Sequence, residues 1–135
     1  MVDRPLPVRD EVNGAYWDGA LAERLVIQRC SVCAIHIHPP RRACPSCGGQ
    51  LEPTEVSGKG TVYGWSIMCS PGNPGFDDKL PYAVLVVELV EQPRLITIGN
   101  LMGGDPASLA IGAPVEVCFE RVTEDIALPQ WRLVI

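Results

Sequence analysis

The sequence predicts a mainly β protein in which a short N-terminal helix and a small four-cysteine ribbon precede a barrel of five strands. Three observations carry this prediction. Helical spacing of apolar residues occurs only in residues 11–25, and two Cys-x-x-Cys pairs lie within residues 30–47. From residue 51 onward, short β-branched and aromatic runs alternate with turn residues. We therefore expect an arm and helix at 1–28, a ribbon at 29–50 and a barrel domain at 51–135.

The helical stretch reads EVNGAYWDGALAERL. Tyr16 begins a series of apolar residues at helical spacing that runs to Leu25, and Trp17 lies beside it. Gly14 and Gly19 lower the helix propensity of the same stretch, so the helix should be short.

The ribbon contains four cysteines with the spacing of a metal site. These are Cys30, Cys33, Cys44 and Cys47. Each Cys-x-x-Cys turn delivers two thiolates, and two such turns complete a tetrahedral zinc site. Four thiolates leave no open coordination position, so the sequence predicts a structural zinc ion without a catalytic role. Iron held by the same four thiolates, as in rubredoxin, is an alternative that the large following barrel does not favour.

Histidines and arginines fill the space between the two cysteine pairs. His36 and His38 alternate with isoleucines, so both should point to one side of a ribbon strand. Either could replace a cysteine as a ligand, but four cysteines suffice, and we expect exposed histidines. Arg41 and Arg42 would offset the charge of the thiolates, and their guanidinium groups also suit phosphate.

Strand signals fill the rest of the chain. The runs are LEPTEVS, GTVYGWSIMCS, YAVLVVELVE, RLITIGNL, APVEVCFERV and PQWRLVI. Residues 82–90 are almost continuously apolar, which predicts a strand buried on both faces, whereas residues 115–120 alternate as in a half-buried strand. Five or six short strands without a second helix favour a five-stranded oligonucleotide/oligosaccharide-binding (OB) barrel. The longest loop, residues 71–81, would border the ligand face of that barrel.

Composition excludes several classes of function. No apolar run is long enough to cross a bilayer, and the N-terminus lacks a signal peptide, so we expect a cytoplasmic protein with reduced thiols. Residues 51–135 carry eleven acidic and five basic side chains, which argues against a nucleic-acid surface. The chain has no nucleophile or phosphate-loop motif, and Cys69 and Cys118 lie in predicted strands as small apolar residues.

These stretches, taken in order, resemble a family long catalogued as a domain of unknown function: an N-terminal helix, a rubredoxin-like zinc ribbon and an acyl-CoA-associated OB domain. The matching segments are YWDGALAERLVIQRCSVC, PPRRACPSC, SGKGTVYGWSI, LPYAVLVVEL, RLITIGNL and GAPVEVCF. The chain departs from the family pattern at Glu91-Gln92-Pro93, where many members have an acidic-glycine turn, and at Ala34, where glycine often follows the first cysteine pair.

The resemblance implies a partner protein and not a free-standing enzyme. Such proteins look like small subunits of thiolase-fold enzymes that act on acyl-CoA, including side-chain-cleaving aldolases of steroid metabolism, and the large subunit carries the catalytic residues. A hetero-oligomer is therefore expected, with a CoA thioester shared between the subunits. On this interpretation Tyr16, Trp17 and Phe76 are candidate docking residues, and Arg41 and Arg42 are candidate contacts to CoA phosphates.

Other interpretations of Tyr16 and of the two arginines remain open. Tyr16 could simply pack on the ribbon, and Arg41 and Arg42 could only balance the negative charge of the thiolates. A nucleic-acid-binding protein is the alternative function, because Tyr63 and Trp65 alternate along one strand as stacking residues would.

Overall fold

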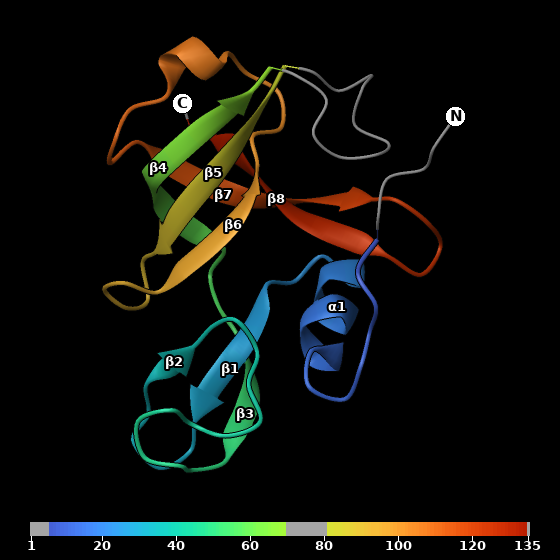
Figure 1. The fold of residues 1–135 in the computed structure, drawn as a ribbon, viewed down its shortest axis with the longest axis vertical. Coiled ribbons are helices and arrows are strands. Elements are labelled where there is room, and N and C mark those ends of the chain that lie inside the picture. Colours follow the sequence, from blue (N-terminus) through green and yellow to red (C-terminus); the bar gives the residue numbers. More distant parts are fainter. Residues whose placement is uncertain (1–5, 70–80, 135) are drawn as a thin grey trace.

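The computed structural model describes residues 6–69 and 81–134 of the chain. It contains one α-helix, one 3₁₀ helix and eight strands within these residues. In order they are α1 (Gly14–Leu21), β1 (Val26–Cys30), β2 (His36–Ile37), β3 (Leu51–Glu55), β4 (Lys59–Met68), β5 (Tyr82–Leu89), β6 (Ile96–Asn100), η2 (Pro106–Ser108), β7 (Pro114–Arg121) and β8 (Ala127–Leu133). Figure 1 shows the helix and the ribbon strands together at one end of the barrel. No helix among the described residues is long and apolar enough to span a membrane.

The helix is shorter than the stretch of sequence that shows helical periodicity. It ends at Leu21 because Glu23 adopts a left-handed conformation with φ of 61°, and the amide of Arg24 returns to the carbonyl of Gly19. Gly19 is also needed for packing, since a Cβ there would lie 2.6 Å from a methyl carbon of Val26 in β1. The expectation of a short helix is confirmed, and Leu25 is buried beyond its end.

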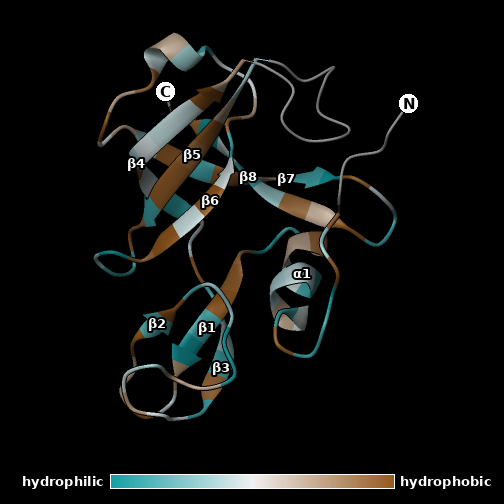
Figure 2. Cartoon of the chain, in the orientation of Figure 1, coloured by the Kyte–Doolittle hydropathy of each residue, from teal (hydrophilic) through white to brown (hydrophobic). Residues whose placement is uncertain are grey.

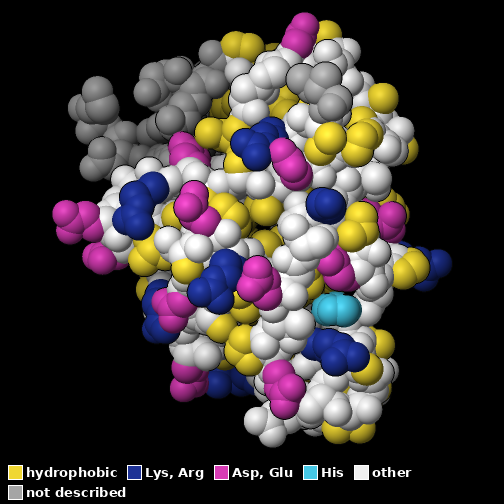
Figure 3. Space-filling view, turned by 180° about the vertical axis from the view of Figure 1, so that it is seen from behind, with side chains coloured by type: hydrophobic (Ala, Val, Ile, Leu, Met, Phe, Trp, Pro, Cys, Tyr) yellow, Lys and Arg dark blue, Asp and Glu magenta, His cyan; other side chains and the backbone are white. Residues whose placement is uncertain are grey.

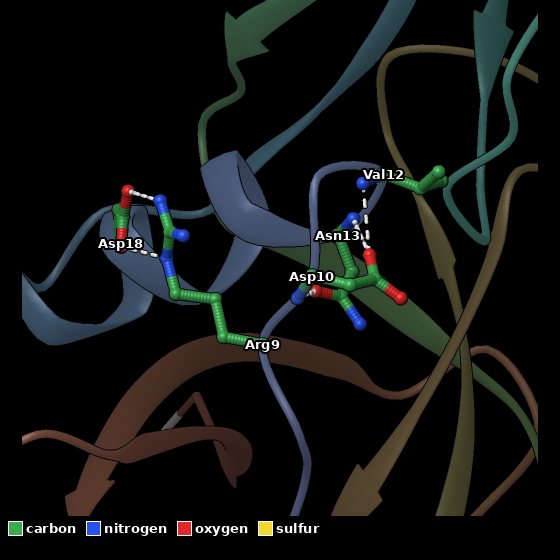
Figure 4. A network of polar contacts seen from close by, with 5 residues as sticks. All are labelled: Arg9, Asp10, Val12, Asn13 and Asp18. Carbon is green, nitrogen blue, oxygen red and sulfur yellow. Dashed lines mark hydrogen bonds and ion pairs between the residues drawn. The ribbon is translucent and has the colours of Figure 1, made fainter.

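Polar contacts fasten the chain before the helix (Figure 4). The Arg9 guanidinium binds Asp18 with two bonds of 2.8 and 2.6 Å, and it lies over Gly14, where a Cβ would be 2.9 Å from its Nη2. The Asp10 carboxylate accepts the amides of Val12 and Asn13, each at 2.8 Å. These backbone donors lower the pKa of Asp10, and the arm is thereby fixed in its approach to α1.

The ribbon is a three-stranded antiparallel sheet in the order β2-β1-β3. Strand β3 pairs with β1 along its whole length, and Leu51 lies opposite Cys30. Residues 51–55, which the sequence analysis placed at the start of the barrel, are thus hydrogen-bonded to the ribbon.

The barrel sheet has the order β6-β5-β4-β7-β8, with antiparallel pairing throughout. It nearly closes where the end of β6 meets β8. Leu101 forms an isolated parallel bridge with Trp131, whose carbonyl accepts the amide of Met102 at 2.7 Å. The buried Gln130 side chain accepts the amide of Asn100 at 2.6 Å and so links the same two strands. The predicted mainly β fold with a five-stranded OB-type barrel is confirmed.

Strand β5 is apolar along most of its length (Figure 2), but only one of its faces is buried. Ala83, Leu85, Val87 and Leu89 are buried, whereas the residues between them are half-buried. The prediction of burial on both faces is wrong because the barrel has a single layer, and no described element covers the outer side of β5. In β7, Val115 is buried, while Val117 and Phe119 pack partly buried against the core.

Tyr16 joins the three parts of the molecule. Its hydroxyl hydrogen bonds with the buried Thr97 of β6, and its ring lies 5.1 Å from the ring of His38 in the ribbon. Burial raises the pKa of Tyr16 to about 12, although the hydrogen bond with Thr97 opposes that shift. The helix therefore touches both ribbon and barrel through one side chain, as expected for a packing residue.

A second contact joins ribbon and barrel directly. The Gln92 side chain, in the turn between β5 and β6, accepts the amide of His36 at 2.8 Å and donates to its carbonyl at 3.1 Å. The Gln92 side chain thus forms with β2 the two hydrogen bonds that the backbone of a neighbouring strand would form. The adjacent Glu91 accepts the amide of Ser57 at 2.9 Å, in the link between β3 and β4. The Glu91-Gln92-Pro93 segment, where the chain departs from the family pattern, therefore joins the ribbon to the barrel. We call the contact of Gln92 with His36 the latch.

Replacement of Gln92 by glutamate should destabilise the protein by about 2 kcal/mol. The carboxylate would lose the donor to the His36 carbonyl and face that carbonyl with negative charge. Urea unfolding monitored by circular dichroism would measure the change. The charge-matched control is Gln50→Glu at an exposed ribbon position, which should stay within about 0.5 kcal/mol. Equal effects of the two substitutions would contradict the latch.

Candidate metal centre

The four predicted cysteines come together at one end of the ribbon. Their sulfur atoms all lie within 4.8 Å of one another. Cys30 and Cys47 are 3.5 Å apart, and Cys33 lies 3.7 Å from both Cys44 and Cys47. A tetrahedral zinc ion with Zn–S bonds of about 2.3 Å requires sulfur separations of about 3.8 Å. The sulfurs therefore fit a tetrathiolate zinc site with little adjustment.

The local backbone explains why these turns present sulfur inward. The amides of Val32 and Cys33 both point at the Cys30 sulfur at 3.4 Å, and the amide of Gly49 points at Cys47 at the same distance. Gly48 adopts φ of 75° just after the last cysteine, a left-handed conformation that glycine adopts without strain. A Cβ on Gly49 would lie 2.8 Å from a methyl carbon of Val32 and 3.0 Å from the Cys30 sulfur, so a larger residue there would have to displace these side chains.

Electrostatics indicate that the four sulfurs can all be thiolates only with a cation between them. The amide of Cys33 lowers the pKa of the Cys30 thiol to about 6, so one thiolate forms readily. At Cys47 the amide of Gly49 favours the thiolate, but the neighbouring thiol of Cys30, desolvation and the thiols of Cys33 and Cys44 outweigh it and raise the pKa to about 12. Four thiolates therefore cannot share this space without a positive ion. With four sulfur ligands the ion would have no free coordination position for substrate.

The arginines of the ribbon are held in different ways. Arg29 donates to the carbonyl of Ala34 within the first cysteine turn at 3.2 Å. Arg42 forms a 2.8 Å ion pair with Glu11, while the amide of Arg41 donates to Gln28 at 2.7 Å. The side chain of Arg42 remains 76% exposed, which leaves it accessible to a ligand.

His36 and His38 differ from the expected pair of exposed residues, because both are partly buried. His38 packs on Tyr16, and its Nδ1 atom is buried without a hydrogen-bond partner among the described residues. Burial lowers the pKa of His38 to about 4, so the ring is neutral at pH 7. The metal-type cluster found in the described part of the chain contains the four cysteines and neither histidine.

Two of the three candidate docking residues lie in the described part of the chain. Tyr16 is used inside the molecule, and Trp17 is half-buried with its ring edge-on to Tyr16 at 4.8 Å. Phe76 lies outside the described residues. Sequence reasoning missed the role of Gln92, although its departure from the family pattern was the available signal.

Two family models match the chain and together cover most of it. The rubredoxin-like zinc ribbon domain of ChsH2 matches residues 17–52, and the C-terminal OB-fold domain of ChsH2 matches residues 53–120. The chain belongs to the ChsH2 family. Because the ribbon of this family is described as a zinc ribbon and the sulfur geometry fits zinc, both observations support a structural zinc ion at the four cysteines.

Relatives of this ChsH2-family chain are named for different functions. A probable enoyl-CoA hydratase alpha subunit of Thermomonospora curvata is 38% identical over 96% of this chain, and a 3-oxo-4,17-pregnadiene-20-carboxyl-CoA hydratase alpha subunit of Mycobacterium tuberculosis is 34% identical over 96%. The chain spans only 40% and 38% of these two proteins. A DUF35 domain-containing scaffold protein of Methanothermobacter thermautotrophicus is 36% identical, with 72% of each chain covered.

Solved structures share the same fold. A chain of the Ltp2-ChsH2(DUF35) aldolase superposes with a TM-score of 0.85 and 34% identity, covering 96% of this chain and 100% of that chain. A DUF35-family protein from Sulfolobus solfataricus, at 14% identity and a TM-score of 0.65, supports the fold.

The conformation of Ala34 yields a test of the first cysteine turn. Ala34 adopts φ of 67°, a left-handed conformation that costs an L-residue about 1 kcal/mol. Ala34→Gly should therefore stabilise the zinc-loaded protein by about 0.5 kcal/mol in urea unfolding. Ala22, exposed with φ of −91°, is the matched control, and Ala22→Gly should destabilise by a similar amount. Destabilisation by both substitutions would contradict the assigned turn.

His38 should make stability depend on pH. Its pKa of about 4 in the folded protein lies below the unfolded value of 6.5, so the unfolded chain binds the proton first. The neutral His38 ring contributes fully to the free energy of unfolding above pH 6.5. This contribution is lost as the pH falls from 6.5 to 4. Between pH 7 and pH 5 the wild type should lose about 2 kcal/mol more than His38→Phe in urea unfolding with excess zinc. Equal curves for wild type and His38→Phe would refute the assignment.

Proposed function

We propose that this chain is a non-catalytic zinc-binding accessory subunit that docks on a thiolase-fold enzyme and helps form its acyl-CoA site. The partner would be a thiolase, an acyltransferase or a side-chain-cleaving aldolase, within a cytoplasmic hetero-oligomer. The observation that carries the proposal is the superposition on the whole of one chain of the Ltp2-ChsH2(DUF35) aldolase at 34% identity. Names such as scaffold protein and alpha subunit among the relatives support membership of a complex.

The described residues also lack the parts of an independent active site. The four ribbon cysteines are committed to one cluster, and His38 is a neutral ring packed on Tyr16. Burial raises the pKa of Cys118, which keeps that thiol protonated and weakly nucleophilic. The buried Nδ1 atom of His38 has no hydrogen-bond partner among these residues, so it does not activate a nucleophile.

For the CoA end of the substrate we propose Arg41 and Arg42. They lie in an exposed segment of the ribbon, and Arg42 is paired with one carboxylate that a phosphate could displace. A nucleic-acid surface is less well supported. On the rear face, acidic side chains are interspersed with the basic ones (Figure 3), whereas phosphate backbones require a basic stripe.

A hydratase complex is the second candidate, favoured by the two relatives named as hydratase alpha subunits. This chain matches less than half of each of those proteins.

Co-expression with a thiolase-fold protein encoded beside this chain in its host should give a stable complex on affinity purification. The complex should cleave or form carbon–carbon or thioester bonds of acyl-CoA, whereas the isolated chain should turn over no acyl-CoA. Cys44→Ser should lose zinc and the complex together, because the ribbon would no longer fold. The substitution Cys118→Ser, outside the ribbon, is the control and should retain both.

Two results would contradict the proposal. One is turnover of an acyl-CoA ester by the isolated chain. The other is a chain that binds only a hydratase subunit in a complex that hydrates an enoyl-CoA, which would favour the second candidate.

Within a thiolase-type complex, replacement of Arg41 and Arg42 by alanine should raise KM for the CoA ester and leave kcat unchanged. Arg24→Ala serves as the exposed control.

A further inference from the structure

The four ribbon cysteines differ in their exposure to solvent. Cys30 and Cys44 are buried, with 1% and 3% of their surface exposed, whereas Cys33 and Cys47 are exposed. Each Cys-x-x-Cys turn therefore contributes an inner cysteine first and an outer cysteine last. Figure 1 shows β1 running away from the barrel, so the turn that follows Cys30 lies at the outer end of the ribbon. A small reagent in solution meets Cys33 and Cys47, which we call the outer pair, before the inner cysteines.

The surroundings of the sulfur atoms agree with this division. The amides of Val32 and Cys33 both point at the Cys30 sulfur at 3.4 Å, and Gly49 packs so closely that a Cβ there would lie 3.0 Å from that sulfur. The sulfurs of the outer pair lie 3.7 Å apart in exposed surroundings. The contacts of Cys30 with Cys47 and of Cys33 with Cys44 are partly buried. Exposure therefore distinguishes the outer pair, although all the sulfurs are similarly close.

We propose that the outer pair is a redox switch, in which a peroxide joins Cys33 to Cys47 as a disulfide and the zinc ion is released. A cysteine that binds zinc is a thiolate, and exposed thiolates are the cysteines that peroxides oxidise.

The oxidation proceeds in two steps. One peroxide oxygen bonds to the first thiolate sulfur, the O–O bond breaks, and hydroxide leaves a sulfenic acid. The second thiolate then attacks that sulfur, so that the S–S bond forms, the S–O bond breaks and hydroxide leaves again. Two protons from solvent convert both hydroxides into water. The two thiolates together lose two electrons, and one peroxide is reduced.

Loss of the outer pair as ligands should disassemble the ribbon. Two thiolates would remain for the ion, whereas a structural zinc site uses four ligands. The buried cluster of the ribbon consists of Cys30, Ile37 and Cys44, so little apolar packing opposes unfolding once the metal has left. β2 carries His36, and an unfolded ribbon would give up its latch to Gln92. Oxidation would thereby detach the ribbon from the barrel, and its effect on a complex rests on the proposed function.

Hydrogen peroxide added to the zinc-loaded full chain, without a partner enzyme, tests the switch. Zinc, measured with a chromogenic chelator, should be released in step with disulfide formation. Trypsin cleaves after Arg29, Arg42 and Lys59 and so separates the two cysteine turns, which mass spectrometry should find joined through the outer pair. Dithiothreitol with added zinc should restore the loaded chain, because a disulfide can be reduced and a sulfinic acid cannot.

Two substitutions of exposed cysteines give a matched comparison. Cys47→His keeps four ligands, since three cysteines and one histidine also hold structural zinc, but it removes one thiolate of the outer pair. It should retain its zinc at the peroxide concentration that empties the wild type. Cys69→Ser removes an exposed cysteine outside the ribbon and should release zinc as the wild type does. Circular dichroism and zinc content before oxidation verify that each variant is folded.

Three results with the wild-type chain would overturn the proposal, whether or not Cys47→His binds zinc well. They are retention of zinc at a peroxide concentration that oxidises Cys69, a disulfide that includes Cys30 or Cys44, and zinc loss that dithiothreitol does not reverse. None of them involves a partner. Capture of the thiolase-fold enzyme by the reduced chain is measured separately, so failure of the switch is distinguishable from failure of the accessory function.

Discussion

Four sulfur atoms within 4.8 Å of one another are the constraint on which the ribbon depends. The ribbon has almost no apolar interior of its own: Cys30, Ile37 and Cys44 are its buried cluster, with Ile35 and Leu51 packed against it. Three short strands with such a core cannot offset the entropy of ordering the chain. A cation shared by four thiolates can, and it also determines which face of each turn is buried.

Apolar packing joins the ribbon to the barrel, since Ile27 of β1 lies in the barrel's core cluster, and specific side-chain contacts fix the orientation further. Tyr16 reaches Thr97 in the barrel and His38 in the ribbon, and Gln92 binds both backbone atoms of His36. Hydrogen bonds impose a direction that apolar packing alone does not. The two contacts bind separate points of the ribbon, so rotation about either one is opposed by the other.

Much of this fold could be predicted because its signals are local. The cysteine spacing, the left-handed Gly48 and the strand runs from residue 59 onward are properties of short segments, and the structure contains them. The predictions that were wrong depended on distant partners. Whether another element covers the outer face of β5, and whether His38 is exposed, depend on segments far away in the chain: no described element packs on that face of β5, and Tyr16 packs on His38. The latch of Gln92 to His36 spans 56 residues, which no local pattern encodes.

The candidate site divides in the same way. Its metal ligands follow from residue type and spacing, whereas its interaction surfaces follow from register. In the sequence, Trp65 and Tyr63 resemble residues that stack on nucleic-acid bases. The pairing of Trp65 with Leu85, however, places Trp65 on the core side of the sheet. An acidic barrel without a catalytic cluster in its described part fits the accessory function proposed above.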